Sequence, residues 1–233
     1  MAGSRRVVGT AARRRVMGAT SRHRVAGAAA TFCAAAGATA VIVALVAGPT
    51  AGFTGYVSEA GVADSGYAGT YRGGVLGLAA GLLLLAAALR PAVRIAAALL
   101  VAGGAATATS GLVTCSAGCP LPPFERTDVA DLAHGGASIA AVASCVFAMA
   151  AVTLYAPVPA LRRLSGTATA VALPLSAAVG LAMLLVGRGH VAGVLERLLL
   201  ADLVLWAALL GAALALRPAD PKKPVDPVFP ADP

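Results

Sequence analysis

Charged side chains are scarce in this chain of 233 residues. Asp, Glu, Lys and Arg make up 12% of it, against roughly 25% in ordinary soluble domains. Aromatic residues contribute 4%, and Trp206 is the single tryptophan. Hydrophobic residues instead reach 59%, and the mean hydropathy is +0.84. A chain with so few charges cannot cover a soluble domain with polar surface, so the composition indicates a membrane protein.

Residues and motifs that identify a reaction or a nucleic-acid partner are also few. The chain has three histidines and four cysteines, and it contains neither a specific catalytic motif nor a nucleic-acid-binding module. The net charge of +8 comes largely from arginines in the first 24 residues. Basic residues beside a membrane span attract anionic lipid by about 1 kcal/mol each. We therefore predict membrane lipids as partners and no nucleic acid, and we lean against an enzyme.

Six long apolar blocks account for the hydrophobic content. A helix needs roughly 20 apolar residues to cross a hydrocarbon core of about 30 Å. These runs lack the alternation of barrel strands, and backbone groups in lipid must bond within their own segment, which a helix achieves. The sequence predicts an all-α fold, a polytopic transmembrane bundle of six helices. The predicted spans are residues 25–47, 73–89, 92–113, 132–155, 167–186 and 195–216.

Orientation follows from the basic residues, because Lys and Arg are concentrated in cytoplasmic loops. One set of termini and loops holds all but four of the 18 Lys and Arg residues. The other four are Arg72, Arg126, Arg188 and Arg197. We predict that both termini are cytoplasmic, that loops 48–72, 114–131 and 187–194 face outward, and that the protein lies in a cell membrane, the plasma membrane of a bacterium.

Three regions follow from this scheme. Residues 1–24 form an Arg-rich cytoplasmic N-terminal segment, residues 25–216 form the transmembrane domain, and residues 217–233 form a Pro-rich cytoplasmic tail. Prolines recur in the tail at every third residue from Pro218 to Pro233. This spacing places them along one edge of a polyproline II helix. A solvated tail and a docking segment for a proline-reading partner both stay open.

Cysteine, charged and histidine residues are concentrated in residues 115–136. Cys115 and Cys119 lie in a predicted outer loop, where an oxidising compartment favours a disulfide. Two thiols without a second Cys or His pair make an incomplete zinc site, so we predict no metal. Cys33 and Cys145 lie within spans, and we expect them to be buried and inert.

Asp131 and His134 share one face at the start of the fourth predicted helix, because they are three residues apart. One interpretation is structural: Asp131 caps the helix and His134 lies at the membrane interface. The other is functional: Asp131 orients the imidazole of His134, which then carries protons or binds a metal. Both interpretations stay open.

Further polar residues lie at the same predicted level. Thr107, Thr109, Ser110 and Thr114 fall at the outer end of the third span. The candidate ligand-binding residues are Arg72, Asp131, His134, His190, Glu196, Arg197 and Asp202, and the catalytic candidates among them are Asp131, His134 and Glu196.

Asp202 lies deeper in the sixth span than the other candidates. An unpaired carboxylate in the membrane costs a few kcal/mol. We therefore expect Arg72 or His134 to pair with it, and a purely structural ion pair is one interpretation.

Two features concern packing. Gly73, Gly77 and Gly81 are spaced by four, and such a stripe lets a neighbouring helix approach closely. Packing within the bundle is the simpler interpretation, and a seam between two copies of the chain is the alternative. Pro174 predicts a bend in the fifth helix.

The sequence resembles a known membrane family. A short outer loop with Cys, Pro and Asp residues precedes a histidine-bearing fourth helix, and Gly187, Gly193, Glu196 and Arg197 open the sixth helix ten residues before Trp206. This pattern resembles the domain of unknown function 998 family, over roughly residues 25–216. The resemblance implies a six-helix integral membrane protein without an assigned reaction. It points to Asp131, His134, Glu196 and Arg197 as the family-type polar positions.

Three functions remain open from the sequence. The first is an outward-facing polar site that binds a lipid headgroup or a small ligand, with or without catalysis. The second is a small transporter that uses Asp202 and the bend at Pro174. The third is a non-catalytic subunit of a homo-oligomer or of a membrane protein partner. No cofactor follows from the sequence.

Overall fold

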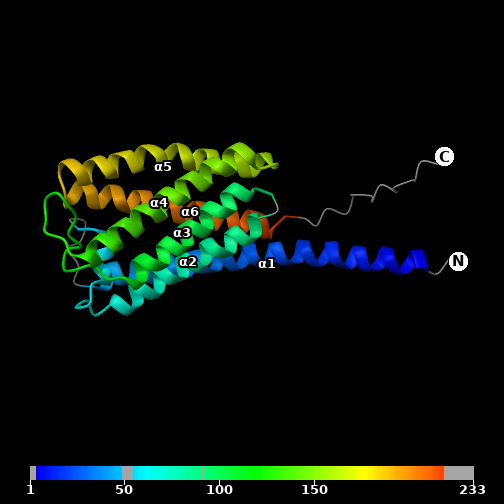
Figure 1. Cartoon of the computed structure of the whole chain (residues 1–233), viewed down its shortest axis with the longest axis horizontal. Helices are drawn as coiled ribbons and strands as arrows, with labels where there is room; N and C mark the ends of the chain where they lie inside the picture. Colours follow the sequence, from blue (N-terminus) through cyan, green and yellow to red (C-terminus); the bar gives the residue numbers. More distant parts are fainter. Residues whose placement is uncertain (1–3, 49–54, 91, 218–233) are drawn as a thin grey trace.

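A bundle of six long helices forms the structure, a computed structural model that describes residues 4–48, 55–90 and 92–217 (Figure 1). These residues contain no strand, and the predicted all-α fold is confirmed. All six helices are long and apolar enough to cross a membrane. The elements are α1 (Ser4–Ala47), the 3₁₀ helix η1 (Val57–Gly61), α2 (Ala68–Leu89), α3 (Arg94–Leu112), α4 (Val129–Tyr155), α5 (Pro159–Leu185) and α6 (His190–Ala215).

The helices pack as a ring in chain order. Each helix contacts its neighbours in sequence, and α6 returns to pack against α1 (Figure 1). With an even number of helices, the start of α1 and the end of α6 lie at the same end of the bundle. At 44 residues α1 is about 66 Å long, so it projects beyond the other helices.

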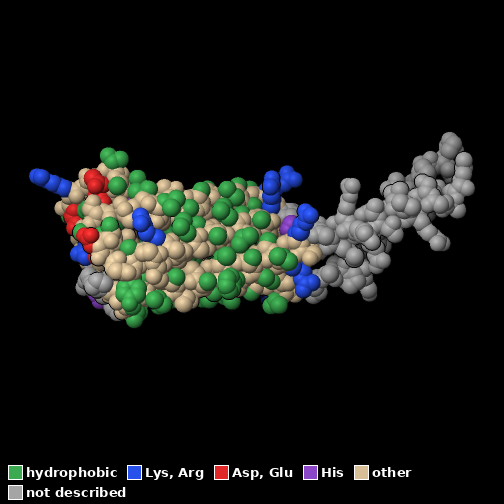
Figure 2. Space-filling model, turned by 90° about the horizontal axis from the view of Figure 1, so that it is seen from below, with side chains coloured by type: hydrophobic (Ala, Val, Ile, Leu, Met, Phe, Trp, Pro, Cys, Tyr) green, Lys and Arg blue, Asp and Glu red, His purple; other side chains and the backbone are tan. Residues whose placement is uncertain are grey.

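On the face shown in Figure 2, acidic side chains gather at one end of the bundle, whereas Lys and Arg side chains lie at both ends. We call one end the polar end; it comprises residues 55–67, 113–128 and 186–189 with the adjoining helix ends. We call the opposite end the arginine end. Its described arginines are Arg22, Arg24, Arg90, Arg94, Arg162, Arg163 and Arg217. The long apolar sides between the ends suit lipid.

Several helices begin before the apolar blocks that predicted them. The block from residue 167 belongs to a helix that starts at Pro159, where the fixed φ of proline suits a first turn. The helix α4 starts at Val129 because Asp128 caps it. The apolar blocks marked the lipid-crossing part of each helix and missed its polar first turns. Through Pro174, α5 continues as one helix.

Large side chains fill the centre of the ring. Leu85, Leu100, Met149 and Leu210 are fully buried there, and so is Trp206. The indole Nε1 of Trp206 donates a hydrogen bond of 2.9 Å to the buried Oγ of Ser165. The one tryptophan therefore reports on the packed core.

Small residues bring α1 close to α2. A Cβ added at Gly74 would lie 2.7 Å from the carbonyl oxygen of Gly37, and Gly77 and Gly81 also face α1. Gly73, however, has no atom within 4 Å of an added Cβ. The predicted stripe had one wrong member: Gly74, and not Gly73, lies at the contact with α1. It serves packing within the bundle, and the alternative seam between two copies stays untested.

The proline-rich tail lies outside the described residues, apart from Arg217 at its start. The predictions of a polyproline II edge and of a docking segment therefore stay predictions.

Gly74→Leu tests the close approach of α1 and α2. We expect it to lower the free energy of unfolding by about 2 kcal/mol, because the new side chain overpacks the contact with Gly37. The fluorescence of Trp206 during thermal unfolding in detergent measures the loss. Gly73→Leu on the same helix should leave stability unchanged, and an equal loss in both variants would contradict this packing.

Candidate functional site

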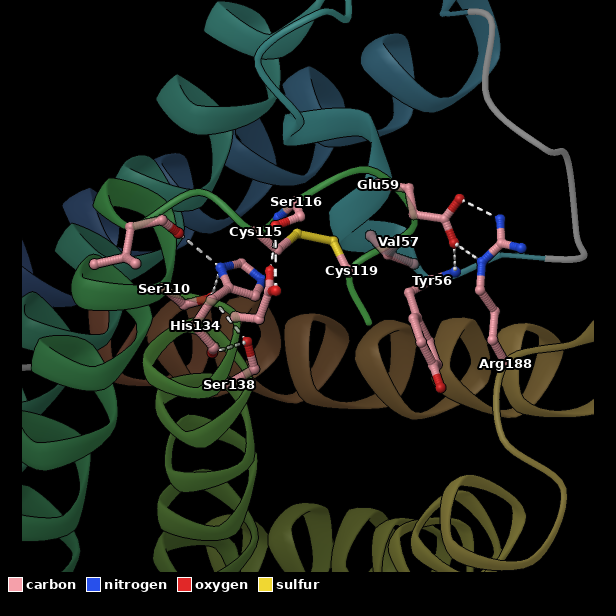
Figure 3. The surroundings of a disulfide bond; sticks show 12 residues. Tyr56, Val57, Glu59, Ser110, Cys115, Ser116, Cys119, His134, Ser138 and Arg188 are labelled. Atoms are coloured by element: carbon pink, nitrogen blue, oxygen red, sulfur yellow. Dashed lines mark hydrogen bonds and ion pairs between the residues drawn. A yellow bond between two sulfur atoms is a disulfide. The ribbon is translucent and has the colours of Figure 1, made fainter. Parts of the chain in front are cut away.

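A disulfide joins Cys115 and Cys119 at the polar end (Figure 3). Their Cα atoms lie 5.0 Å apart. A tight turn brings them together, in which the N–H of Cys119 donates to the carbonyl of Ser116 at 2.9 Å and Gly118 takes a φ of +83°. Both cysteines are buried and pack against Tyr56. The predicted pairing is present.

Asp131 ties this loop to the first turn of α4. Its carboxylate accepts from the N–H and the Oγ of Ser116, at 2.7 and 3.1 Å, and from the N–H of Asp128 at 3.0 Å. Asp128 in turn accepts from the N–H of Asp131 at 2.8 Å, which completes a reciprocal cap. Because these bonds engage both carboxylate oxygens, Asp131 is a structural residue in this arrangement.

His134 takes its orientation from a different group. Its Nδ1 lies 2.8 Å from the carbonyl oxygen of Val113 and 3.5 Å from the Oγ of Ser110. A carbonyl oxygen can only accept, so Nδ1 carries a proton, and in the neutral form of the ring the lone pair is on Nε2. Ser110 and Ser138 are joined by a hydrogen bond of 2.8 Å beside the ring. Of the two interpretations, these contacts agree with Asp131 as a cap and not with Asp131 as the group that orients His134.

Both Arg72 and His134 cap the C-terminus of α3. The last carbonyl groups of a helix lack partners within the helix. Val113 is the C-cap residue directly after α3, and its carbonyl bonds to His134. The carbonyl of Leu112 accepts from Nη2 of Arg72 at 3.4 Å. One side chain from α2 and one from α4 thus meet at the C-terminus of α3.

A small cavity lies at this point. It has a volume of about 10 Å³ and is lined by Ser58, Gly61, Tyr71, Arg72, Ser110, Gly111, Val113, Thr114, Cys115 and His134. That space suits about one water molecule. Two buried atoms of its lining, Nε of Arg72 and Nε2 of His134, have no hydrogen-bond partner. One is a donor and the other is an acceptor.

His134 also lies beside the disulfide. The sulfur atoms of Cys115 and Cys119 and a ring nitrogen of His134 all lie within 4.8 Å of one another. The three residues are buried. In the part of the chain that the structure describes, the three residues form the single group of this kind that could hold a metal ion.

Glu196 and Arg197 hold the segment after α1. Oε2 of Glu196 accepts from the N–H of Val57 at 2.9 Å. Nη1 of Arg197 donates to the carbonyls of Gly55 and Gly193, at 2.9 and 2.7 Å. Both family-type residues of α6 therefore bind backbone groups.

Arg188 and Glu59 link two loops by an ion pair. Nε and Nη2 of Arg188 each donate to a carboxylate oxygen of Glu59 at 2.7 Å (Figure 3). These bonds raise the pKa of Arg188 and keep its guanidinium charged. Glu59 also accepts from the N–H of Tyr56 at 2.8 Å. Burial, and then the charge of Glu196, raise the pKa of the Tyr56 phenol.

Two other candidates do not join the site. His190 is exposed at the start of α6 and belongs to no metal-binding group with His134, Asp131 or Glu196 among the described residues. The Oδ2 atom of Asp202 is buried and has no hydrogen-bond partner. The expected pairing of Asp202 with Arg72 or His134 was wrong, because those side chains bond to the end of α3.

Comparison with known proteins identifies the family. A family model described as a protein of unknown function (DUF998) matches residues 29–213. The chain belongs to the DUF998 family. No curated protein and no solved structure matches this DUF998 chain. Together with six helices able to span a membrane, the family supports a multi-pass membrane protein and assigns no reaction.

Some site residues escaped the sequence analysis. The sequence TDVAD marks a cap at Asp128 with Asp131 three residues later, and this signal predicts that Asp131 turns toward its own helix end. No sequence pattern points to the carbonyl of Val113 as the partner of His134, because every residue has a backbone carbonyl. The proximity of His134 to the cysteines depends on how α3 and α4 pack.

Asp131→Ala tests the structural role of this carboxylate. The substitution strands the N–H groups of Ser116 and Asp128, so we expect a loss of about 3 kcal/mol in the free energy of unfolding. Thermal unfolding followed by Trp206 fluorescence measures it. Glu125→Ala, at an exposed acidic residue of the same loop, is the control and should change stability little. Equal stability of the two variants would contradict the role.

Proposed function

We propose that this chain is a membrane protein whose polar end faces outward and binds a hydroxyl group of a lipid headgroup. The site is the cavity between Arg72 and His134. Both termini lie in the cytoplasm in this proposal, as the distribution of basic residues predicts. The binding is non-catalytic.

The observation that carries the proposal is that two residues lining one cavity, Arg72 and His134, each have a buried nitrogen without a partner. Buried polar groups in native proteins have partners, and an orphan points to a missing water, ion or ligand. Nε–H of Arg72 needs an acceptor, and Nε2 of His134 needs a donor. A hydroxyl group is a hydrogen-bond donor and an acceptor at once. An ammonium group donates only, and an ionised phosphate diester accepts only, so neither satisfies the pair.

The size and place of the cavity fit one hydroxyl group and exclude a whole headgroup. About 10 Å³ holds a single oxygen, so the rest of the headgroup must stay outside. Arg72 is half-buried, and a guanidinium binds phosphate well. A glycerol headgroup would place a hydroxyl in the cavity and its phosphate beside Arg72.

The remaining functional hypotheses have less support. The bonds of Asp131 to Ser116 and Asp128, and that of Glu196 to Val57, engage two of the three catalytic candidates. This agrees with a non-catalytic protein. Transport keeps one argument, the unpartnered Oδ2 of Asp202. A role as a partner subunit or homo-oligomer is compatible with headgroup binding and stays a prediction.

Two lipids of equal charge test the headgroup. Phosphatidylglycerol carries headgroup hydroxyls, and phosphatidylmethanol is an equally charged diester without one. We expect native mass spectrometry of the detergent-solubilised protein to show preferential binding of phosphatidylglycerol. Arg72→Gln should weaken that binding about tenfold, because a hydrogen bond from a charged donor is worth about 1.5 kcal/mol or more.

Arg90→Gln is the matched control, because Arg90 lies at the opposite end of α2 and is exposed. It should leave phosphatidylglycerol binding unchanged. Equal binding of the two lipids by the unaltered protein contradicts the proposal, and so does an equal loss in Arg72→Gln and Arg90→Gln. In those cases the cavity holds water, and anionic lipids associate with the protein by nonspecific electrostatic attraction.

A further inference from the structure

The disulfide and His134 form a second potential site in the same region. We propose that reduction of the Cys115–Cys119 disulfide creates a binding site for a thiophilic d¹⁰ cation, Zn²⁺ or Cu⁺. Its ligands are the two thiolates and Nε2 of His134. This departs from the sequence-based prediction of no metal, because the packing of α4 against the loop supplies the histidine that the cysteine spacing lacked.

His134 is already arranged as a metal ligand. Metal-binding histidines hold their second ring nitrogen on a carbonyl or carboxylate, which fixes the tautomer and the ring direction. Here Nδ1 of His134 is held by the carbonyl of Val113 at 2.8 Å. Nε2 is buried, without a hydrogen-bond partner, and the side chain is 6% exposed. The lone pair that a cation needs is therefore free and shielded from bulk water.

The cysteine loop brings both sulfurs to the same place. The turn of residues 115–119 keeps the two Cα atoms 5.0 Å apart. The ligand atoms of all three residues lie within 4.8 Å of one another. Around a tetrahedral cation with metal–sulfur bonds of about 2.3 Å, ligand atoms lie on the order of 3.5 to 3.8 Å apart. Breaking the sulfur–sulfur bond lets the thiolates separate to that spacing without moving the turn.

The chemistry balances with a dithiol reductant. The dithiol gives two electrons and two protons to the Cys115–Cys119 disulfide and becomes a disulfide itself, which leaves two thiols on the chain. Binding of the cation then releases the two thiol protons and forms two metal–sulfur bonds and one metal–nitrogen bond. The oxidised chain lacks these ligands, because a disulfide sulfur carries no thiolate charge.

The donor set selects the class of cation. Two thiolates and one imidazole suit Zn²⁺ and Cu⁺, whereas Mg²⁺ and Ca²⁺ require oxygen ligands. Asp131, the nearest carboxylate in sequence, is held by Ser116 and Asp128. A three-ligand site leaves one position of a tetrahedral Zn²⁺ open to water.

This inference goes beyond the headgroup site and does not depend on it. Both use Nε2 of His134, so a bound cation and a bound hydroxyl exclude each other. Arg72 takes part in headgroup binding alone, and the cysteines supply metal ligands alone.

Metal titration of the full chain tests the inference. The protein carries Cys33→Ala and Cys145→Ala, so that the remaining thiols are those of the pair, and is reduced with a dithiol in detergent. The dithiol, which itself binds Cd²⁺, is removed before the titration, and alkylation of a sample confirms free thiols. We expect the reduced protein to bind one Cd²⁺ per chain, with a thiolate-to-metal absorption band in the ultraviolet. Zn²⁺ and Cu⁺ should each displace it, and their competition identifies the preferred cation. The oxidised protein should show no band.

Matched variants locate the ligands. Cys115→Ser should weaken Cd²⁺ binding at least a hundredfold, and His134→Gln at least tenfold. His190→Gln, at the exposed histidine of the same end, should bind as the parent does. The inference is overturned if the pair resists reduction in the folded protein, if reduced protein binds no stoichiometric Cd²⁺, or if His190→Gln and His134→Gln weaken binding equally.

Arg72→Gln separates this site from the headgroup site. It should bind Cd²⁺ as tightly as the parent while its binding of phosphatidylglycerol weakens about tenfold. If the parent chain binds Cd²⁺ but does not distinguish the two lipids, the headgroup proposal alone is contradicted. If the chain distinguishes the lipids but binds no Cd²⁺ when reduced, the metal-site proposal alone is contradicted.

Discussion

Peptide groups in hydrocarbon have no water to bond with, and this constraint organises the whole molecule. It requires helices over the apolar blocks, and it moves loops, caps and charges to the two ends. The ring of α1 to α6 follows, because each helix packs on its neighbours and large side chains such as Trp206 and Leu210 fill the centre. Where helices come closest, as at Gly37 and Gly74, glycine is required because a Cβ would meet a carbonyl oxygen.

The same constraint explains why the polar chemistry meets at one point. When α3 ends, its last carbonyl groups must find donors near the edge of the membrane. Arg72 of α2 and His134 of α4 supply them, through Leu112 and Val113. Each of these side chains then keeps one buried nitrogen without a partner. The cavity and the cysteine–histidine cluster thus both depend on how one helix is capped.

The other contacts of the polar end fix this arrangement. Asp131 holds the loop that carries the disulfide, Glu196 and Arg197 hold the segment before α2, and Arg188 pairs with Glu59. The polar end is therefore held by bonds between loops that are distant in sequence. The unbonded atoms of Arg72 and His134 stand out against these satisfied groups, and the proposals are built on them.

The sequence was sufficient for the number of helices, for the lengths of five of them to within about two turns, and for the disulfide, because hydropathy and cysteine spacing act locally. The exception is α1, which begins at Ser4, 21 residues before the predicted span. It also identified Arg72 and His134 as candidates, since polar residues in an apolar chain are conspicuous. It failed for the partners of Asp131, His134 and Asp202, which depend on helix rotation and on backbone carbonyls. Gly73 was mistaken for Gly74 for the same reason: a shift of one residue turns a helix face by about 100°.

The account depends most on the claim that the helices cross a membrane with the polar end outward, and cysteine labelling tests it directly. In a chain carrying Cys33→Ala and Cys145→Ala, a single reporter is introduced as Gly66→Cys at the polar end or Ala160→Cys at the arginine end, both at exposed positions. A membrane-impermeant maleimide should label residue 66 in intact cells and residue 160 only after permeabilisation. Labelling of residue 160 alone in intact cells, or of both residues equally, would contradict the account.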